Sequence, residues 1–212
     1  MDNDLRCISH EIRNQISVCE LYTQIIKKTL EKENYKNKSI DNAINCISKS
    51  LKLIGNNLID LKSIDNTVLK RCEIKEIIKE GINLSIVYIQ DKDIKINLNC
   101  KNGCDVYVDE NKFLGCVINI IKNAIEAIDK KGEINIDISE DNNTVNITIS
   151  NDGKPIDKNA DIFEKGYTTK KTGNGFGLAI CRENIGLMNG NLKLIKSDSN
   201  STEFLITIPK YN

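Results

Sequence analysis

The N-terminal third of the chain carries an apolar side chain at every third or fourth position, the spacing of a helix that buries one face. The first run contains no proline or glycine, and it consists of Leu5, Ile8, Ile12, Ile16, Cys19, Thr23, Ile26 and Leu30. After a polar segment at 32–38, the second run consists of Ile40, Ile44, Ile47, Leu51, Ile54, Leu58 and Leu61. We expect Ser39 to be the N-cap of the second helix. The pattern therefore predicts a hairpin of two long helices.

Such a hairpin is marginal alone, because two helices bury little apolar area. A second copy of the chain would complete a four-helix bundle by two-fold association, so we expect a homodimer. His10 is the single histidine of the sequence. It lies about 200° around the helix from Ile12, at about 100° per residue, away from the apolar stripe. This position disfavours a histidine packed in the core, and leaves a solvated surface histidine or a functional one.

The helical periodicity fails around residues 63–69, and we place a domain boundary between residues 66 and 67. Beyond it, helical and strand patterns alternate. We expect helices at 73–88, 110–129 and 175–189, and strands at 93–98, 104–108, 133–139, 144–150, 191–197 and 203–209. This order predicts an α+β fold in which helices cover one face of a sheet.

Composition excludes several classes of protein. Thirty Lys and Arg residues balance thirty Asp and Glu residues, so no net field favours nucleic acid or an anionic membrane. No apolar run approaches the roughly 18 residues of a membrane span, and the N-terminus does not have the pattern of a signal peptide. Eight cysteines are scattered through a chain without an export signal, which predicts free and mostly buried thiols. We therefore expect a cytoplasmic protein.

A long irregular stretch at 151–174 follows a predicted strand, and loops of this length are usually functional or disordered. It leads into "GNGFGLAI", Gly173 to Ile180. Glycines let a backbone approach a ligand, and the N-terminus of the next helix offers N–H groups to a phosphate. Taken alone, the same residues are also compatible with a flexible connector.

Two carboxamides share one face of the predicted helix at 110–129. Asn119 and Asn123 are four residues apart, and Glu126 lies approximately on the same face. Carboxamides on a partly apolar helix need hydrogen-bonding partners. A hydrated Mg²⁺ ion with nucleotide phosphates would supply them. Exposed asparagines in an Asn-rich chain are the alternative.

Five segments resemble, in the same order, the motifs of bacterial two-component histidine kinases. "SHEIRNQ" is similar to their phosphoacceptor box, "NIIKNAIEAI" to the asparagine box, "SNDGKPI" to the first glycine box, "IFEKGYTTK" to the phenylalanine box and "GNGFGLAI" to the second glycine box. Each alone is weak evidence, but five in order are strong. The resemblance implies a dimerisation and phosphoacceptor hairpin at 1–66. It also implies, at 67–212, an ATP-binding α/β sandwich of the superfamily shared with gyrase and the ninety-kilodalton heat-shock chaperone.

The resemblance assigns a role to the single histidine. It implies that His10 attacks the γ-phosphate of ATP and then passes the phosphoryl group to an aspartate of a response regulator. A neutral imidazole is nucleophilic at neutral pH. Glu11 is placed to orient the ring or to accept its proton. Asn14 matches the position at which phosphatase-competent members hold an attacking water.

The resemblance also implies a nucleotide site in the second domain. Asn123 matches the Mg²⁺ ligand, and Asn119 and Lys122 match residues near the phosphates. Asn151 and Gly153 match residues on the adenine side. Gly173, Gly175 and Gly177 match the phosphate-side loop. The mobile lid is matched by Phe163, Thr168, Thr169 and Lys170. The implied cofactors are ATP and Mg²⁺.

Three positions depart from the family's pattern. The family usually has Asp where this chain has Asn151, and the neutral amide predicts weaker adenine binding. It often has Pro where Gln15 stands, so the usual helix bend is not expected. It usually has Gly where Pro155 stands, which fixes a dihedral angle and removes a donor.

The leading interpretation is an ATP-dependent autophosphorylating histidine kinase. The alternative is a histidine phosphotransferase, a relay module with a kinase-like fold that does not use ATP, and a scaffold is a weaker third interpretation. The presence of Asn123, Lys170 and the lid glycines favours the kinase, because a relay module does not need them. Because His10 lies close to the start, the signal would come from a separate sensor protein, or the chain is a truncated kinase.

Overall fold

A computed structural model of the chain describes residues 19, 22–33, 35–60, 67–100, 103–157, 160–169 and 175–210. The chain divides into two compact units, Met1–Asn66 and Thr67–Asn212. This division falls where the apolar periodicity of the sequence fails. No helix in these described ranges is long and apolar enough to cross a membrane.

The first unit contains two helical segments, residues 22–32 and α2 at Lys38–Asp60. Asn37 caps α2, because its side-chain Oδ1 accepts hydrogen bonds from the backbone N–H groups of Ser39, at 3.0 Å, and Ile40, at 3.3 Å. The predicted N-cap at Ser39 is therefore wrong. The helix begins one residue before Ser39, and asparagine caps helices at least as well as serine. The part of the first predicted helix at 5–18 lies outside the described residues.

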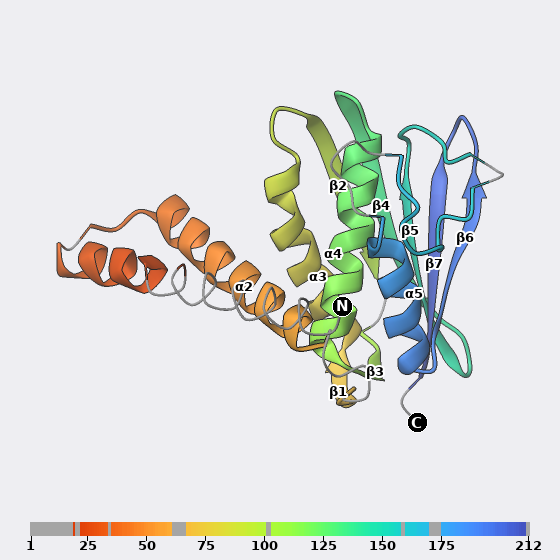
Figure 1. Ribbon diagram of the computed structural model, residues 1–212, viewed down its shortest axis with the longest axis horizontal. Coiled ribbons are helices and arrows are strands. Elements are labelled where there is room, and N and C mark those ends of the chain that lie inside the picture. The colour runs from red at the N-terminus through yellow and green to blue at the C-terminus, as the bar shows by residue number, and fades with distance from the viewer. Residues whose placement is uncertain are drawn as a thin grey trace. The chain divides into compact units, whose positions relative to one another are not determined.

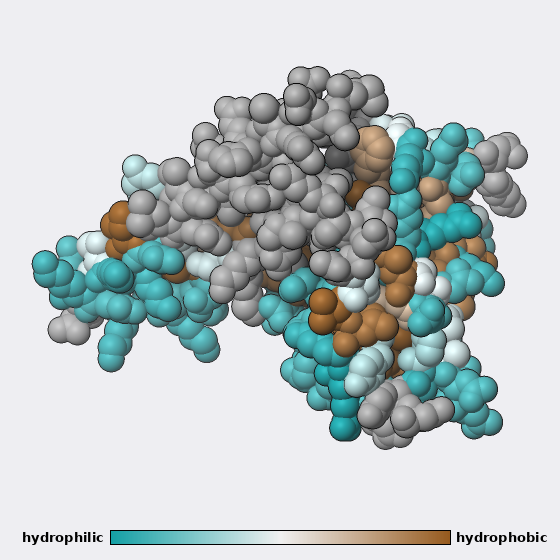
Figure 2. Space-filling view, turned by 60° about the horizontal axis from the view of Figure 1, so that its bottom comes forward, coloured by the Kyte–Doolittle hydropathy of each residue, from teal (hydrophilic) through white to brown (hydrophobic). Residues whose placement is uncertain are grey.

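Apolar side chains of this first unit reach its surface, as Figure 2 shows in its left part. Ile26 and Ile47 belong to the predicted apolar stripes, yet each is 50% exposed, and Ile25 is 47% exposed. Thr23 and Ile44 of the same stripes are buried. The stripes are thus only partly covered within one copy of the unit.

The second unit is built on a five-stranded sheet of order β2-β4-β5-β7-β6. Its strands are β2 at Asp93–Cys100, β4 at Lys131–Glu140, β5 at Thr144–Asn151, β6 at Asn191–Ser197 and β7 at Thr202–Pro209. β2 runs parallel to β4, and the other neighbours are antiparallel. A separate antiparallel pair joins β1 at Lys70–Glu73 to β3 at Asp105–Val108.

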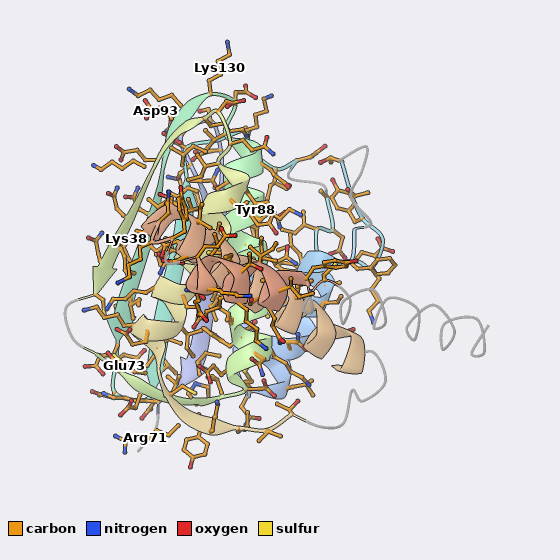
Figure 3. The ribbon with its side chains drawn as sticks, turned by 90° about the vertical axis from the view of Figure 1, so that its left-hand side faces the viewer. Lys38, Arg71, Glu73, Tyr88, Asp93 and Lys130 are labelled. Carbon is orange, nitrogen blue, oxygen red and sulfur yellow. The ribbon has the colours of Figure 1, made fainter. Side chains whose placement is uncertain are left out.

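Three helices cover one face of the large sheet, as Figure 1 shows. They are α3 at Ile74–Ser85, which continues into the 3₁₀ helix η1 at Ile86–Tyr88, α4 at Glu110–Ala127 and α5 at Gly177–Leu187. α4 lies between α3 and α5 and contacts both. Figure 3 shows Arg71 and Glu73 near one end of this unit and Asp93 and Lys130 together at the other.

The core lies between the sheet and the helices. In β5, Val145, Ile147 and Ile149 are buried while the residues between them are half-buried, so the strand presents one apolar face. On α4, the side chains of Phe113, Val117, Ile120, Ile121 and Ile125 are fully buried. The predicted arrangement, with helices on one face of a sheet, is confirmed for this unit.

The predicted helices and strands of the second unit are found with ends shifted by a few residues, but β1 was missed. Its sequence "KRCE" has no apolar alternation, and only Cys72 is even half-buried. The strand forms because Lys70–Glu73 pairs antiparallel with Val108–Asp105. All seven described cysteines are free as predicted, but the expectation of mostly buried thiols was too strong, because only Cys104, Cys116 and Cys181 are buried.

Candidate nucleotide-binding site

The predicted magnesium and phosphate residues lie in the C-terminal half of α4. Asn119 and Asn123 are one turn apart, and Asn123 Nδ2 donates to Asn119 Oδ1 at 3.4 Å. Lys122 lies beside them, with its Nζ 5.1 Å from the centre of the Tyr88 ring and 3.7 Å from Glu126 Oε1. The two carboxamides thus share one face of the helix, as the sequence predicted.

The start of α5 packs directly against Asn119. A β-carbon at Gly177 would lie 2.4 Å from Asn119 Nδ2 and 2.7 Å from Asn119 Oδ1, so a side chain at this position would displace the amide. Phe176 precedes the helix and has no polar side-chain atom to cap it. A helix N-terminus offers backbone N–H groups to a ligand, and its dipole favours an anion there.

Two thiols hold α4 and α5 together just beside this contact. Cys116 Sγ donates to the Cys181 carbonyl oxygen at 3.7 Å, and Cys181 Sγ donates to the Cys116 carbonyl oxygen at 3.8 Å. Both side chains are buried. The hydrogen bond with Cys116 and the burial raise the pKa of the Cys181 thiol well above its ordinary value. The Cys181 thiol is thus neutral, and the two hydrogen bonds link α4 to α5.

Glycines also hold the base of the predicted lid. Gly166 N donates to the Gly175 carbonyl oxygen at 3.1 Å. The φ angles of Gly166 and Gly175 are 89° and 72°, in the region that favours glycine. A β-carbon at Gly175 would lie 2.4 Å from the Gly166 carbonyl carbon. Both positions therefore require glycine, and they bring together the two ends of the segment at 166–175.

The first part of the predicted lid is attached to the side of α5. The guanidinium carbon of Arg182 lies 5.2 Å from the centre of the Phe163 ring, a cation–π distance. Lys165 Nζ forms an ion pair with Glu183 Oε1 at 2.6 Å. Thr168 and Thr169 are exposed. The predicted lid thus rests on the same helix whose N-terminus faces Asn119.

The end of β5 approaches the C-terminus of α4. A β-carbon at Gly153 would lie 2.6 Å from the carbonyl carbon of Ala127 and 2.7 Å from its oxygen. The next residue, Lys154, donates its backbone N–H to the same Ala127 oxygen at 2.9 Å. Its ammonium group lies 2.7 Å from Asp129 and holds the pKa of that carboxyl below its ordinary value. Packing against the helix thus requires a glycine at position 153, independently of any ligand.

Asn151, the predicted base-reading residue, is the last residue of β5. Its side chain is only 4% exposed. Its Nδ2 has no hydrogen-bond partner within the part of the chain that the structure describes. A β-carbon at Gly153 would lie 2.8 Å from this nitrogen, so the amide faces the space left by that glycine. A buried donor without a partner is costly and indicates a missing acceptor.

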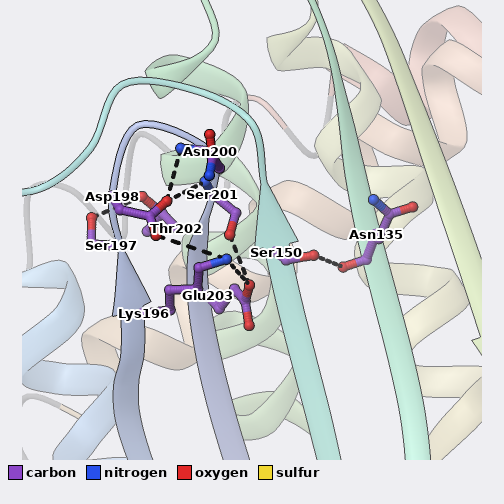
Figure 4. Close-up of polar contacts among 9 residues, drawn as sticks. All are labelled: Asn135, Ser150, Lys196, Ser197, Asp198, Asn200, Ser201, Thr202 and Glu203. Carbon is purple, nitrogen blue, oxygen red and sulfur yellow. Dashed lines mark hydrogen bonds and ion pairs between the residues drawn. The ribbon is translucent and has the colours of Figure 1, made fainter.

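The turn between β6 and β7 is held by polar contacts among its own residues, which include Ser197 and Thr202 (Figure 4), and it supports the loop after Asn151. Ser197 Oγ accepts a hydrogen bond from Ile156 N at 2.8 Å and lies 3.1 Å from Thr202 Oγ1. Thr202 is buried and is the register partner of Asn151 in the β5–β7 pair. Sequence reasoning missed Ser197 and Thr202, because no local pattern links them to a segment more than forty positions away.

The candidate site extends along α4 between two points of contact. Gly177 contacts the helix at Asn119, and Gly153 contacts it at Ala127. These positions are separated by about 12 Å at roughly 1.5 Å per residue. The end at Asn119 presents carboxamides and a helix N-terminus, which suit phosphates. The end at Ala127 presents the buried amide of Asn151, which suits a polar edge of a base.

Several predicted site residues lie outside the described residues. They are His10, Glu11 and Asn14 of the first unit, and Lys170 and Gly173 of the lid segment. Their roles stay predictions. The described residues that the fold does bring together are Asn119, Asn123, Gly175 and Gly177 at one end, and Asn151 and Gly153 at the other.

Residues 108–212 match the family described as histidine kinase-, DNA gyrase B-, and HSP90-like ATPases. The matched region includes α4, the end of β5 and the start of α5, which form the two-ended site. Residues 108–212 are an ATPase domain of this family. The predicted resemblance to this superfamily is thereby confirmed for residues 108–212.

The similarity to relatives extends beyond the ATPase domain. Sporulation kinase C of Bacillus subtilis (strain 168) is 29% identical over 206 residues, covering 95% of this chain and 47% of that protein. Sporulation kinase A of the same organism is 29% identical over 213 residues, covering 96% of this chain and 34% of that protein. The chain thus spans about half the length of these relatives, or less.

A solved structure agrees with these relatives. The catalytic domain of histidine kinase ThkA superposes with a TM-score of 0.59 at 28% identity, covering 67% of this chain and 95% of that chain. The resemblance to histidine kinases predicted from the five motifs is therefore confirmed by sequence and by fold.

Proposed function

We propose that the chain is the core of an ATP-dependent histidine kinase that phosphorylates His10. The observation that carries the proposal is the contact between Gly177 and Asn119. It joins two segments, each similar to a nucleotide-binding motif, at the N-terminus of α5. Carboxamides, backbone N–H groups and a helix dipole at one point suit the phosphates of ATP. The ATPase domain and the histidine kinase relatives support the same function.

The residues on α4 fit a magnesium ion held together with the nucleotide. Asn119 and Asn123 lie on one face of the helix, within hydrogen-bonding distance of each other. An amide oxygen is the type of ligand that Mg²⁺ takes, usually beside several waters and substrate phosphates. When bound, the ion would neutralise charge on the phosphates. We propose Asn123 as its protein ligand, with Asn119 beside the phosphates.

In the proposed reaction, a ring nitrogen of His10 attacks the γ-phosphorus of ATP. An N–P bond forms while the bond between the γ-phosphorus and the bridging oxygen of ADP breaks. Glu11 accepts the proton from the other ring nitrogen. The N–P bond then breaks as the phosphoryl group passes to an aspartate carboxylate of a response regulator. Glu11 returns the proton to the ring, which leaves His10 neutral.

We propose a homodimer formed by the first unit. Half-exposed Ile25, Ile26 and Ile47 support it, because a second copy would cover them in a four-helix bundle. The expected result is a dimer mass by light scattering at micromolar concentration. A monomer mass would exclude the bundle. We also propose a cytoplasmic location, which the free cysteines support.

The match to an ATPase domain favours the kinase over a phosphotransferase that does not use ATP. A direct test is the incorporation of phosphate from γ-labelled ATP in the presence of Mg²⁺. We expect label in the wild type, little in Asn123→Ala, and wild-type labelling in Asn191→Ala, an exposed asparagine at the start of β6. Equal labelling of Asn123→Ala and Asn191→Ala would contradict the proposed site. A wild type that takes no label would favour the phosphotransferase.

A further inference from the structure

The side chain of Asn151 carries a hydrogen-bond donor that the described protein leaves unused. The residue is 4% exposed, and its Nδ2 is buried without a partner among the described residues. A carboxamide has both a donor and an acceptor, whereas a carboxylate has acceptors only. A ligand that fits this amide should therefore offer an acceptor as well as a donor.

The position of Asn151 determines which part of a ligand it meets. This step rests on the proposed nucleotide site, whose phosphate end lies at Asn119 and Gly177. Asn151 lies beside Gly153 at the opposite end, about 12 Å along α4 at roughly 1.5 Å per residue. With the phosphates at the first end, the base of the nucleotide reaches the amide.

The two kinds of purine present different edges to this amide. Adenine offers a donor at its 6-amino group and an acceptor at N1, whereas a 6-oxopurine offers an acceptor at O6 and a donor at N1–H. An amide matches both edges, because rotating it by 180° exchanges its oxygen and nitrogen. A carboxylate opposite position 6 accepts a hydrogen bond from the 6-amino group of adenine, whereas O6 of a 6-oxopurine would face it as a second acceptor.

We propose that Asn151 makes this site accept 6-oxopurine nucleoside triphosphates, of the inosine and guanosine type, in addition to ATP. The residue beside Nδ2 is a glycine, so no side chain at position 153 covers the amide. Asn151 is thus a specificity-determining residue for the base.

The test is calorimetric binding of Mg·ATP and Mg·ITP to the full chain, because ITP differs from ATP only at ring positions 1 and 6. The wild type should bind ITP within about tenfold of ATP, since an amide pairs with both edges. Asn151→Asp should bind ATP about five- to tenfold more tightly. It should reject ITP by about 100-fold or more relative to ATP, because O6 then lacks a donor. Asn191→Asp introduces the same charge at an exposed site and should keep the wild-type ratio.

The outcomes separate this inference from the proposed function. A wild type that binds ATP but binds ITP more than about 100-fold more weakly overturns the inference and leaves the ATP site intact. An Asn151→Asp variant with the wild-type ratio removes Asn151 from base selection. If neither nucleotide binds the wild type or the variant, the proposed nucleotide site itself is wrong, and the inference falls with it.

Discussion

Replacing Gly153 by alanine tests whether the end of β5 is held against α4 as described. The added β-carbon would lie 2.6 Å from the carbonyl carbon of Ala127 and 2.7 Å from its oxygen, about 1 Å inside an optimal contact. Both atoms belong to the backbone of the helix end and cannot rotate away. The strand end and the helix end must therefore separate, which strains the hydrogen bond from Lys154 N to Ala127 O.

The expected loss of stability in Gly153→Ala is the sum of three contributions. Overpacking of this kind costs about 1–3 kcal/mol, and a weakened backbone hydrogen bond adds about 0.5–1 kcal/mol. The reduced entropy of the unfolded chain offsets about 0.4–1 kcal/mol. We expect Gly153→Ala to lower the free energy of unfolding by about 1–3 kcal/mol, and the melting temperature by about 2–4 °C for each kcal/mol.

The assay is urea and thermal unfolding of the full chain, followed by the circular dichroism of β-structure, because every described strand belongs to the second unit. Gly186→Ala is the matched control. Gly186 lies within α5, and a β-carbon there would meet nothing within 4 Å. It should raise stability by about 0.4–1 kcal/mol. A Gly153→Ala variant as stable as the wild type would refute the close packing.

Three further predictions concern other parts of the chain. Lys92 Nζ caps the C-terminus of α4, because it donates to the carbonyl oxygens of Ile125 and Ile128 at 2.8 and 2.6 Å. Lys92→Met should lower the free energy of unfolding in urea by about 1–2 kcal/mol. An unchanged urea midpoint would contradict this role of Lys92. Hydrogen bonds from Asn143 N, and from the side chain and backbone of Thr144, lower the pKa of Asp141 from 3.8 to about 2, which an NMR titration can verify. Because the pKa of Asp141 is lower in the folded state than in the unfolded state, its ionised carboxylate stabilises the fold at pH values above 3.8. This stabilisation is lost as the pH falls from 3.8 towards about 2. The free energy of unfolding of Asp141→Ala should therefore fall less steeply than that of the wild type in this pH range. Asn14→Ala should slow dephosphorylation of the response regulator while labelling from ATP stays unchanged, and an undiminished rate would remove Asn14 from that role.

Much of the fold of the second unit follows from local periodicity. The alternation in 144–150 and the helical spacing in 110–129 predicted β5 and α4 to within two residues at each end. β1 could not be predicted, because its polar residues gain their structure from pairing with β3 and not from a buried face of their own. The cap of α2 was misplaced because Asn37 and Ser39 are both good caps, and only the observed helix start distinguishes them.

For the site, the sequence predicts which residues take part but not which of them are in contact. The resemblance to kinase motifs identified Asn119, Gly153 and Gly177, but spacing alone does not predict which of them touch. The contact of Gly177 with Asn119, and the support of Ile156 by Ser197, join residues that are distant in sequence. The sequence also did not predict that Asn151 Nδ2 is buried without a partner among the described residues, because burial depends on the assembled sheet and helix.

The phosphoacceptor assignment is the central claim, and its most direct measurement is the chemical stability and location of the phosphate after incubation with Mg·ATP. The account predicts a phosphate that is labile in acid and stable in alkali, as expected for a phosphorylated ring nitrogen, and that is absent from His10→Gln. A label that persists in His10→Gln would contradict the claim.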